Sequence, residues 1–501
     1  MSGSFLAVFV PLFVAIGGIE AYFFAKMVPL RYRRWTGTMA AAWLAAAFGL
    51  LIIADRMGLV AGDEPFALLR VSTLGLILGL LATGLGALAA FASQGRIEPN
   101  GPVQLYYPLF LFALAGVVAV GFSNDLFTLF VMVELSAIPS YALVAYRYRE
   151  DSRSLSAALK YLIQGVTGTI TALLGVSLLY VAGHTLVISD LPGRLIGADP
   201  AIITLAAALI LIGYSVKLAV VPLHTWLPDA YVRAPAGVTA IMAGATKAGA
   251  LIALLLSLSA LPVGVNGSAY LGIAVNLLAV LTMTIGNLLA LNQTDLRRVL
   301  AYSSVAQMGY ILLGFGIALQ WNVPLGFEAA IFYAVAYSVM KGGAFLGADL
   351  LANAAGSPET ARMRGVGARH PVVGIAFTIF ILGLIGVPTT AGFLGKLLVF
   401  QAGMSTANLG GITLVLILAA NSALSLGYYV PILSTLLFQG HEAANATPIA
   451  AADGGEERMP RSTSASVAVL AAVTVYLGLF PQILFDWIQR ASPLFPGGVR
   501  P

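Results

Sequence analysis

The chain has 501 residues, of which 59% are hydrophobic and only 9% are charged. Soluble globular domains carry about 25% charged residues, so this composition excludes an ordinary soluble protein and favours a membrane protein. The chain contains no cysteine, which excludes disulfides and thiolate ligands for zinc or iron–sulfur clusters. The net charge of +5 comes from arginines in short polar segments and indicates no nucleic-acid partner.

Apolar runs of about 20 residues are long enough to cross a bilayer as helices. The sequence has fourteen of them, at 4–29, 37–60, 66–94, 104–122, 124–146, 154–182, 201–228, 235–262, 268–293, 296–318, 325–354, 371–405, 410–437 and 464–490. The runs predict an all-α polytopic membrane protein with about 14 transmembrane helices and no soluble domain. The longest polar stretch, 439–463, is expected to be a loop.

Arginines distribute unevenly between the two sets of loops. Loops that follow odd-numbered spans hold fifteen arginines, whereas loops that follow even-numbered spans, together with the C-terminal tail, hold four; Arg70 lies near a helix start and is ambiguous. Because cytoplasmic loops are enriched in Lys and Arg, this asymmetry predicts that both termini are extracytoplasmic. We therefore expect a multi-pass protein of the cell's inner (plasma) membrane.

Two spans contain helix-breaking residues. The seventh carries Pro222 and Pro228, and the twelfth carries Pro388 between Gly386 and Gly392. Discontinuous helices at matching places in two halves are typical of inverted repeats with an ion path at the midplane. We therefore predict helices 1–3 at 1–100, two inverted five-helix repeats at 101–263 and 264–438, the loop at 439–463 and a last helix in 464–501.

Charged residues inside the spans are the candidate functional residues, because an ionisable group in the bilayer is costly and is retained for a purpose. Arginine stays charged in proteins, whereas lysine releases its proton when desolvated. Lysines inside spans therefore indicate proton movement. Glu134, in mid-span, and four lysines are the principal candidates; the lysines are Lys217, Lys247, Lys341 and Lys396.

Each candidate also has a structural interpretation. Glu134 could form a fixed ion pair or stay protonated, Lys217 could extend to the interface, and the other deep lysines could be passive packing charges. Three residues are auxiliary candidates, namely Lys160, His224 and Gln307. Two carboxylates near span ends, Glu20 and Asp349, are expected to be solvated or to contact another subunit.

Several stretches resemble the antiporter-like membrane subunits of the respiratory complex I superfamily. They are Val-Glu134-Leu-Ser-Ala-Ile-Pro-Ser-Tyr, Ala-Leu-Lys160-Tyr-Leu, the run from Lys217 to Tyr231 with His-Thr-Trp-Leu-Pro-Asp, Asp295-Leu-Arg-Arg-Val-Leu-Ala-Tyr-Ser-Ser, and Gly-Val-Pro388 to Gly-Lys396. The resemblance covers roughly residues 100 to 440. It includes features of the N-type and M-type NADH-quinone oxidoreductase subunits and of the related subunits of Mrp sodium/proton antiporters and membrane-bound hydrogenases. Gln307 replaces a histidine that the N-type and M-type often carry.

The resemblance implies fourteen helices and a hydrophilic axis along the membrane midplane. It makes Glu134 and Lys217 a coupled pair, Lys247 the connecting lysine and Lys396 the gate of the second half-channel. Lys341 is expected to relay protons between Lys247 and Lys396. The residues show no nucleotide, flavin, quinone or metal motif, so we expect no cofactor and no redox site in this chain itself.

The leading hypothesis is a proton-translocating subunit of a complex I-type NADH-quinone oxidoreductase or a related redox-driven ion pump. Its partners would be other membrane subunits and peripheral redox subunits. The alternatives are a subunit of an Mrp-type Na⁺/H⁺ antiporter or a membrane-bound hydrogenase, and a structural scaffold that conducts nothing. The residues leave open which complex it is, whether Na⁺ moves as well as H⁺, and the direction of transport.

Overall fold

The computed structural model describes residues 3–58, 69–94, 96–97, 102–261, 267–438 and 459–491, and these residues are almost all helical. The helices are α1 (Gly3–Met27), α2 (Trp35–Arg56), α3 (Thr73–Ser93), α4 (Val103–Phe122), α5 (Leu126–Val144), α6 (Arg153–Gly183), α7 (Leu191–Arg194), α8 (Pro200–Leu218), α9 (Leu227–Arg233), α10 (Ala236–Ile241), α11 (Lys247–Ser259), α12 (Gly267–Leu291), α13 (Leu296–Trp321), α14 (Pro324–Ala354), α15 (Val366–Arg369), α16 (Pro371–Ile385), α17 (Ala391–Ser405), α18 (Leu409–Phe438), α19 (Arg461–Leu479) and α20 (Gln482–Ala491). One turn of π-helix, Met242–Thr246, joins α10 to α11. Within the described ranges no strand forms, and β pairing is limited to isolated bridges.

The all-α polytopic fold is confirmed. Thirteen helices of the described part are long and apolar enough to cross a membrane, and they match every predicted span except the twelfth. That span forms two shorter helices, α16 and α17, on either side of a break. Most of the predicted loop at 439–463 lies outside the described residues. The grouping of the helices into two inverted repeats stays a prediction.

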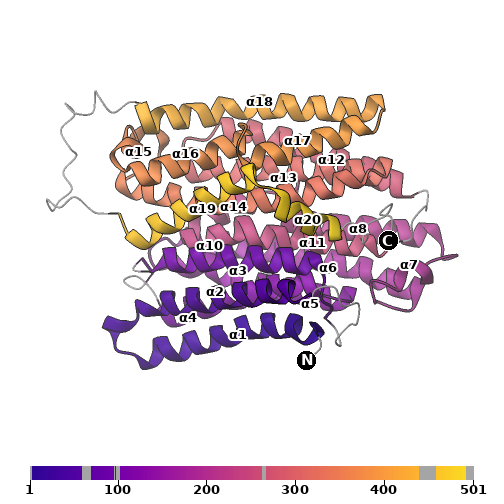
Figure 1. Ribbon diagram of the computed structural model, residues 1–501, viewed down its shortest axis with the longest axis horizontal. Coiled ribbons are helices and arrows are strands. Elements are labelled where there is room, and N and C mark those ends of the chain that lie inside the picture. Colours follow the sequence, from indigo (N-terminus) through magenta and orange to yellow (C-terminus); the bar gives the residue numbers. More distant parts are fainter. Residues whose placement is uncertain are drawn as a thin grey trace.

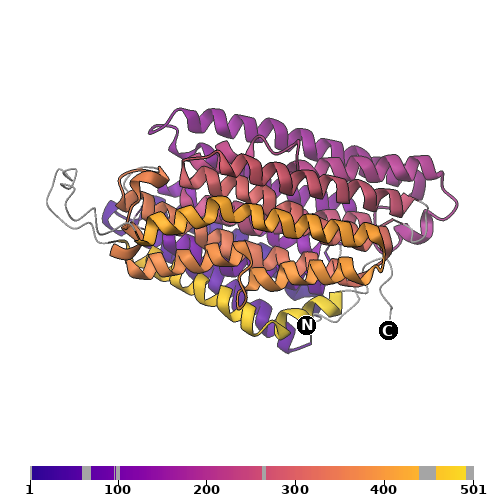
Figure 2. The same ribbon diagram turned by 90° about the horizontal axis from the view of Figure 1, so that it is seen from above.

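The helices run side by side along the long axis of the molecule (Figure 1). In that view α1 forms one edge and α18 the opposite edge, and contacts connect them through α2, α3, α14 and α17 in turn. Figure 2 shows α6 along one face and α19 with α20 along the opposite face. The core lies around α13 and α14, and most residues of these two helices are buried.

Helix starts follow local sequence signals. Asp125, Asp199 and Asp295 each accept a hydrogen bond from a backbone N–H in the first turn of α5, α8 and α13, as N-cap residues do. Proline occupies the first position of α8, α14 and α16, where its missing N–H leaves no helical hydrogen bond unmade. Short-range signals of this kind therefore determine where many of the spans begin.

The chain leaves the helical conformation near Pro222 and again near Pro388. α8 ends at Leu218, because the next residue, Ala219, adopts a left-handed conformation at φ 56°. The next helix, α9, begins at Leu227. α16 ends at Ile385 because Gly386 takes φ 95°, and α17 starts six residues after that end, at Ala391. Each break leaves backbone carbonyls of the preceding helix without helical partners, inside a part of the protein where water is scarce.

The last predicted span, 464–490, is crossed by a shorter helix than expected and ends in a second, separate helix. α19 ends at Leu479, and α20 begins at Gln482 after Pro481, which cannot continue the hydrogen-bond ladder of α19. α20 is amphipathic: Leu484 and Ile488 are buried, while Asp486 and Gln489 lie on its other side. α19 alone is long enough to cross, and it packs across α3, α14 and α16.

Arginines and aspartates form ion pairs at the end of the bundle where the odd-numbered spans finish. The Asp229 carboxylate on α9 binds Lys160 Nζ of α6 at 2.7 Å and Arg298 Nη2 of α13 at 2.8 Å. Burial works to raise the pKa of Asp229, but the hydrogen bonds and charges of Lys160 and Arg298 outweigh it and hold the pKa below its ordinary value. In the same region Asp151 pairs with Arg153 and Arg233. These pairs connect helices that are far apart in the sequence.

Asp229→Asn tests this network. The substitution keeps the shape but removes both ion pairs, so we expect a loss of about 1 kcal/mol for these partly exposed groups, seen as a lower melting temperature at neutral pH. The folded pKa of Asp229 is depressed, so its contribution is complete above the unfolded pKa and disappears as the pH falls below about 4. The difference in melting temperature between the wild type and Asp229→Asn should therefore disappear at acidic pH.

Asp190→Asn is the matched control, because Asp190 is exposed and its recorded side-chain partner is the neighbouring Ser189. It should leave the melting temperature unchanged. Equal melting temperatures for wild type and Asp229→Asn at neutral pH would show that the network does not stabilise the fold.

Candidate functional site

Glu134 on α5 and Lys217 on α8 lie together, as the sequence predicts. The Glu134 Oε1 to Lys217 Nζ distance is 3.4 Å, and the two side chains are 18% and 5% exposed. Lys217 Nζ also donates to the Tyr141 hydroxyl at 2.8 Å, which is shorter than its contact with the carboxylate. Lys217 is in the last turn of α8, where the negative end of the helix dipole favours a cation. The lysine therefore has an alternative partner when the carboxylate moves away.

Aromatic rings fill the space between Lys217 and the next lysine. Tyr141 packs edge-on against Tyr161, which stacks on Trp226 at 4.2 Å, and Trp226 meets Tyr231. Trp226 Nε1 donates to the Val216 carbonyl in the last turn of α8, at 2.9 Å. This aromatic row begins at Tyr141, which contacts Lys217, and ends at Tyr231, whose ring centroid lies 5.9 Å from Lys247 Nζ.

Lys247 and Lys341 bind the same stretch of α13. Lys247 Nζ donates to the Ser304 carbonyl at 3.3 Å and lies 5.9 Å from the ring centroids of Tyr231 and Tyr337. Lys341 Nζ donates to the Leu300 carbonyl at 2.9 Å and to the Ser303 hydroxyl. Both lysines are almost wholly buried, at 2% and 0% exposure. Their acceptors are neutral dipoles, not carboxylates.

Lys396 uses the second helix break. Its Nζ donates to the carbonyls of Leu384 and Ile385 at 3.0 and 2.8 Å, which are the carbonyls freed where α16 ends. Gln307 Nε2 donates to the same Leu384 carbonyl at 3.1 Å. Lys396 Nζ also lies 4.7 Å from the Tyr310 ring centroid. The break thus provides the acceptors for a lysine that comes from the following helix.

Further hydrogen bonds extend from the residues that contact Lys341 and Lys396 toward α18. Ser303, which binds Lys341, meets the Tyr429 hydroxyl at 2.7 Å. Past Lys396, the Tyr310 hydroxyl accepts from Asn287 at 3.0 Å, and Asn287 also contacts Asn421 of α18. A row of polar groups therefore runs from α11 through α13 to α18.

The auxiliary candidates lie differently. Gln307 is part of the row and also accepts from the Tyr333 hydroxyl. Lys160 is 45% exposed and belongs to the Asp229 ion pair, outside the buried row. His224 lies in the segment between α8 and α9; it is partly buried, and its Nδ1 has no hydrogen-bond partner among the described residues.

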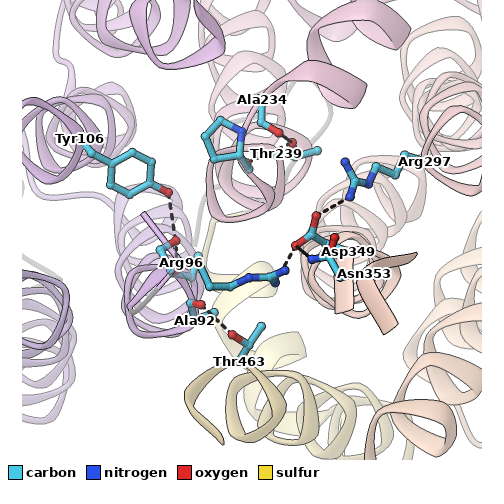
Figure 3. Close-up of polar contacts among 12 residues, drawn as sticks. Ala92, Arg96, Tyr106, Ala234, Thr239, Arg297, Asp349, Asn353 and Thr463 are labelled. Atoms are coloured by element: carbon cyan, nitrogen blue, oxygen red, sulfur yellow. Dashed lines mark hydrogen bonds and ion pairs between the residues drawn. The ribbon is translucent and has the colours of Figure 1, made fainter. Parts of the chain in front are cut away.

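Asp349 was expected to be solvated or to contact another subunit, and that prediction is wrong. Its carboxylate is 5% exposed and binds Arg96 and Arg297, each at 2.6 Å (Figure 3). Arg96 lies beyond the end of α3 and Arg297 in the first turn of α13, so both reach across to α14. Asp349 is two turns from Lys341 on the same helix, toward the Arg-rich end of the bundle.

Sequence reasoning assigned no role to Tyr141 or Asp229. Tyr141 could have been found, because it follows Glu134 by seven residues and so lies on the same face of α5, two turns away. Asp229 gave no such signal, because its partner Lys160 is 69 residues away in the sequence. Within the described ranges, no group of three or more His, Cys, Asp or Glu side chains is arranged to hold a metal ion.

Comparison with known proteins gives the family. Residues 123–425, more than half of the chain, match the family described as NADH:quinone oxidoreductase/Mrp antiporter, TM. NADH-quinone oxidoreductase subunit N of Mycobacterium tuberculosis is 34% identical over 419 residues, which cover 82% of this chain and 75% of that protein. F(420)H(2) dehydrogenase subunit N of Methanosarcina mazei is 32% identical over 480 residues, 92% of each chain.

A solved structure agrees. A chain of respiratory complex I from Thermus thermophilus superposes with a TM-score of 0.74 at 25% identity, covering 95% of this chain and 98% of that chain. The resemblance read from the sequence motifs is thereby confirmed. The chain belongs to the NADH:quinone oxidoreductase/Mrp antiporter transmembrane family.

Proposed function

We propose that this chain is a proton-translocating membrane subunit of a redox-driven complex of the NADH-quinone oxidoreductase type. The observation that carries the proposal is the row of buried lysines that begins at the Glu134–Lys217 pair and continues through Lys247 and Lys341 to Lys396. Five ionisable groups in the interior of a membrane protein are costly. A scaffold that conducts nothing would gain little from keeping them. Relatives named as subunit N of redox complexes support the same conclusion.

The pair at α5 and α8 is the coupling element. An opposite charge within about 4–6 Å favours the charged form of a lysine, so Glu134 at 3.4 Å holds the proton on Lys217. When a neighbouring subunit attracts Glu134 away, Lys217 keeps its hydrogen bond to Tyr141 but loses the charge that held its proton. The proton is then released toward Lys247. The groups titrate as a coupled set.

The later steps need no carboxylate. The acceptors of Lys247, Lys341 and Lys396 are mainly backbone carbonyls, which accept a hydrogen bond from an ammonium or from a neutral amine alike. Each lysine can therefore gain or lose a proton without losing its place. The aromatic row from Tyr161 to Trp226 separates the first transfer from the rest and makes it the controlled step.

Partners and orientation complete the proposal. Other membrane subunits and peripheral redox subunits would supply the electron chemistry, and this chain would hold no cofactor. The Arg-rich ends, including α15, would face the cytoplasm, and α7 would lie at the opposite surface (Figure 1). Both termini would then be extracytoplasmic. Membership of a family that also includes Mrp antiporter proteins keeps Na⁺/H⁺ exchange as the alternative.

Lys247→Arg tests the relay. Arginine keeps the positive charge but does not release its proton, so we expect proton translocation to fall roughly a hundredfold, the order of a lost acid–base group. Glu134→Gln, which removes the charge that controls Lys217, should reduce it similarly. Proton uptake in vesicles that contain the assembled complex is the measurement.

Lys26→Arg is the matched control, because Lys26 is exposed near the end of α1 and should tolerate arginine. Complex content per vesicle corrects for any loss of assembly caused by the larger side chain. Full translocation by an assembled Lys247→Arg complex would exclude Lys247 as a relay.

Single cysteines test the orientation, since the native chain has none. Ser152→Cys lies between α5 and α6, and Ser189→Cys lies between α6 and α8; both positions are exposed. A membrane-impermeant thiol reagent added to intact cells should label Ser189→Cys alone. Labelling of Ser152→Cys alone would show that the chain has the opposite orientation in the membrane.

Purification under mild conditions tests the assembly. We expect this chain to co-purify with membrane subunits and with peripheral flavin and iron–sulfur subunits, because its described residues offer no energy source for transport. Recovery with nickel-site subunits would assign it to a hydrogenase. Recovery with small membrane subunits alone would favour the Na⁺/H⁺ antiporter alternative and contradict the redox assignment.

A further inference from the structure

Glu20 is a carboxylate on the outer surface of the bundle. It lies on α1, it is exposed, and four large apolar side chains surround it on the same face of the helix, namely Leu12, Ile16, Ile19 and Phe23. This stripe would face lipid hydrocarbon in an isolated chain. Glu20 is six residues from Lys26 in the last turn of α1, so it lies about 9 Å below that end. An ionised carboxylate at such a place is costly without a partner.

The described residues provide Glu20 with one recorded hydrogen bond and no ion pair. Its recorded hydrogen bond comes from Trp43 Nε1 on α2, at 3.1 Å to Oε2, and none of the ion pairs among the described residues includes it. Lys26 is directed over the Tyr22 ring at 5.7 Å. Trp43 fixes the carboxylate in position but leaves its negative charge uncompensated. No described residue of the chain thus supplies the compensating positive charge.

The adjacent surface of α2 suits the close approach of another helix. Ala42, Ala45, Ala46 and Gly49 follow one another on the outer face of α2, and the first three are exposed. A side chain added at Gly49 would meet nothing within 4 Å, so no part of this chain covers that position. Small residues four apart are the pattern by which membrane helices pack against each other closely. This face of α2 is next to Trp43, whose indole N–H binds Glu20.

We infer that the surface formed by Glu20, Trp43 and the Ala42–Gly49 face of α2 is an interface for a transmembrane helix of a neighbouring subunit, and that this helix places a lysine or arginine against Glu20. The inference rests on the proposed assembly into a larger complex. It specifies which surface of the chain makes one subunit contact and that the contact is an ion pair. It is independent of the buried lysine row, because α1 contacts α2 and α4 and not the helices that carry those lysines.

Three variants of Glu20 distinguish a protein partner from lipid. If Glu20 pairs with a cation, Glu20→Leu leaves that cation buried and unpaired, so the fraction of neighbouring subunit lost in detergent should rise roughly tenfold or more. Glu20→Lys should abolish the contact by like-charge repulsion. If Glu20 faces lipid instead, Glu20→Leu removes a charge from hydrocarbon and should leave the complex equally or more stable, which would overturn the inference.

Glu20→Gln separates charge from shape. It retains the size of the side chain and the hydrogen bond from Trp43 but has no charge, so it should weaken the complex in the same direction as Glu20→Leu. Full stability of the Glu20→Gln complex would show that the partner group is neutral and would overturn the cation assignment.

Cross-linking identifies the occupant directly. A photoreactive residue at Ala46 in the purified complex should attach to a membrane subunit, and the attached peptide should contain a lysine or arginine within an apolar segment. Attachment to phospholipid alone would overturn the inference. If no other subunit purifies with the chain at all, the proposed function fails as well; if subunits co-purify but none cross-links at Ala46, only this interface is excluded.

Discussion

Every N–H of a buried ammonium group needs an acceptor, and in the bilayer interior water is not there to supply one. This requirement explains the position of Lys396 beside the end of α16. Lys396 binds the two carbonyls that become free when α16 stops at Ile385. An unbroken helix would use those carbonyls itself, and Lys396 would lose its acceptors. The other buried lysines find their acceptors elsewhere: Lys217 uses Glu134 and Tyr141.

The choice of acceptor also decides which lysine can be controlled. Lys247 and Lys341 bind carbonyls of one stretch of α13, whose position is fixed by the core of the bundle. Lys217 is the one lysine of the row with a carboxylate partner, and Glu134 is partly exposed on α5. A charge outside the chain can act on Glu134 but hardly on a buried carbonyl. In the mechanism that we propose, control therefore belongs at the α5 end, and the remainder of the row responds.

Sequence patterns predicted local features well and distant contacts poorly. Hydropathy located the spans, and Pro222 and Gly386 located the breaks, because each depends on neighbouring residues alone. The pairing of Glu134 with Lys217 came from resemblance and is present in the structure. The burial of Asp349 was missed, because its partners Arg96 and Arg297 come from other helices. The separation of α20 was missed because average hydropathy does not distinguish a spanning helix from an amphipathic one.

Lysine and arginine have separate tasks in this chain because their chemistry differs. At the Arg-rich end Arg96, Arg297 and Arg298 bind carboxylates, and since arginine keeps its charge these contacts persist at any ordinary pH. Arg297 and Arg298 lie in the first turn of α13, one turn before the carbonyl that Lys341 uses. These ion pairs thus fix the position of α13, whose backbone carbonyls accept hydrogen bonds from Lys247 and Lys341. The proposed proton path depends on groups that change charge, and it is held in place by groups that do not.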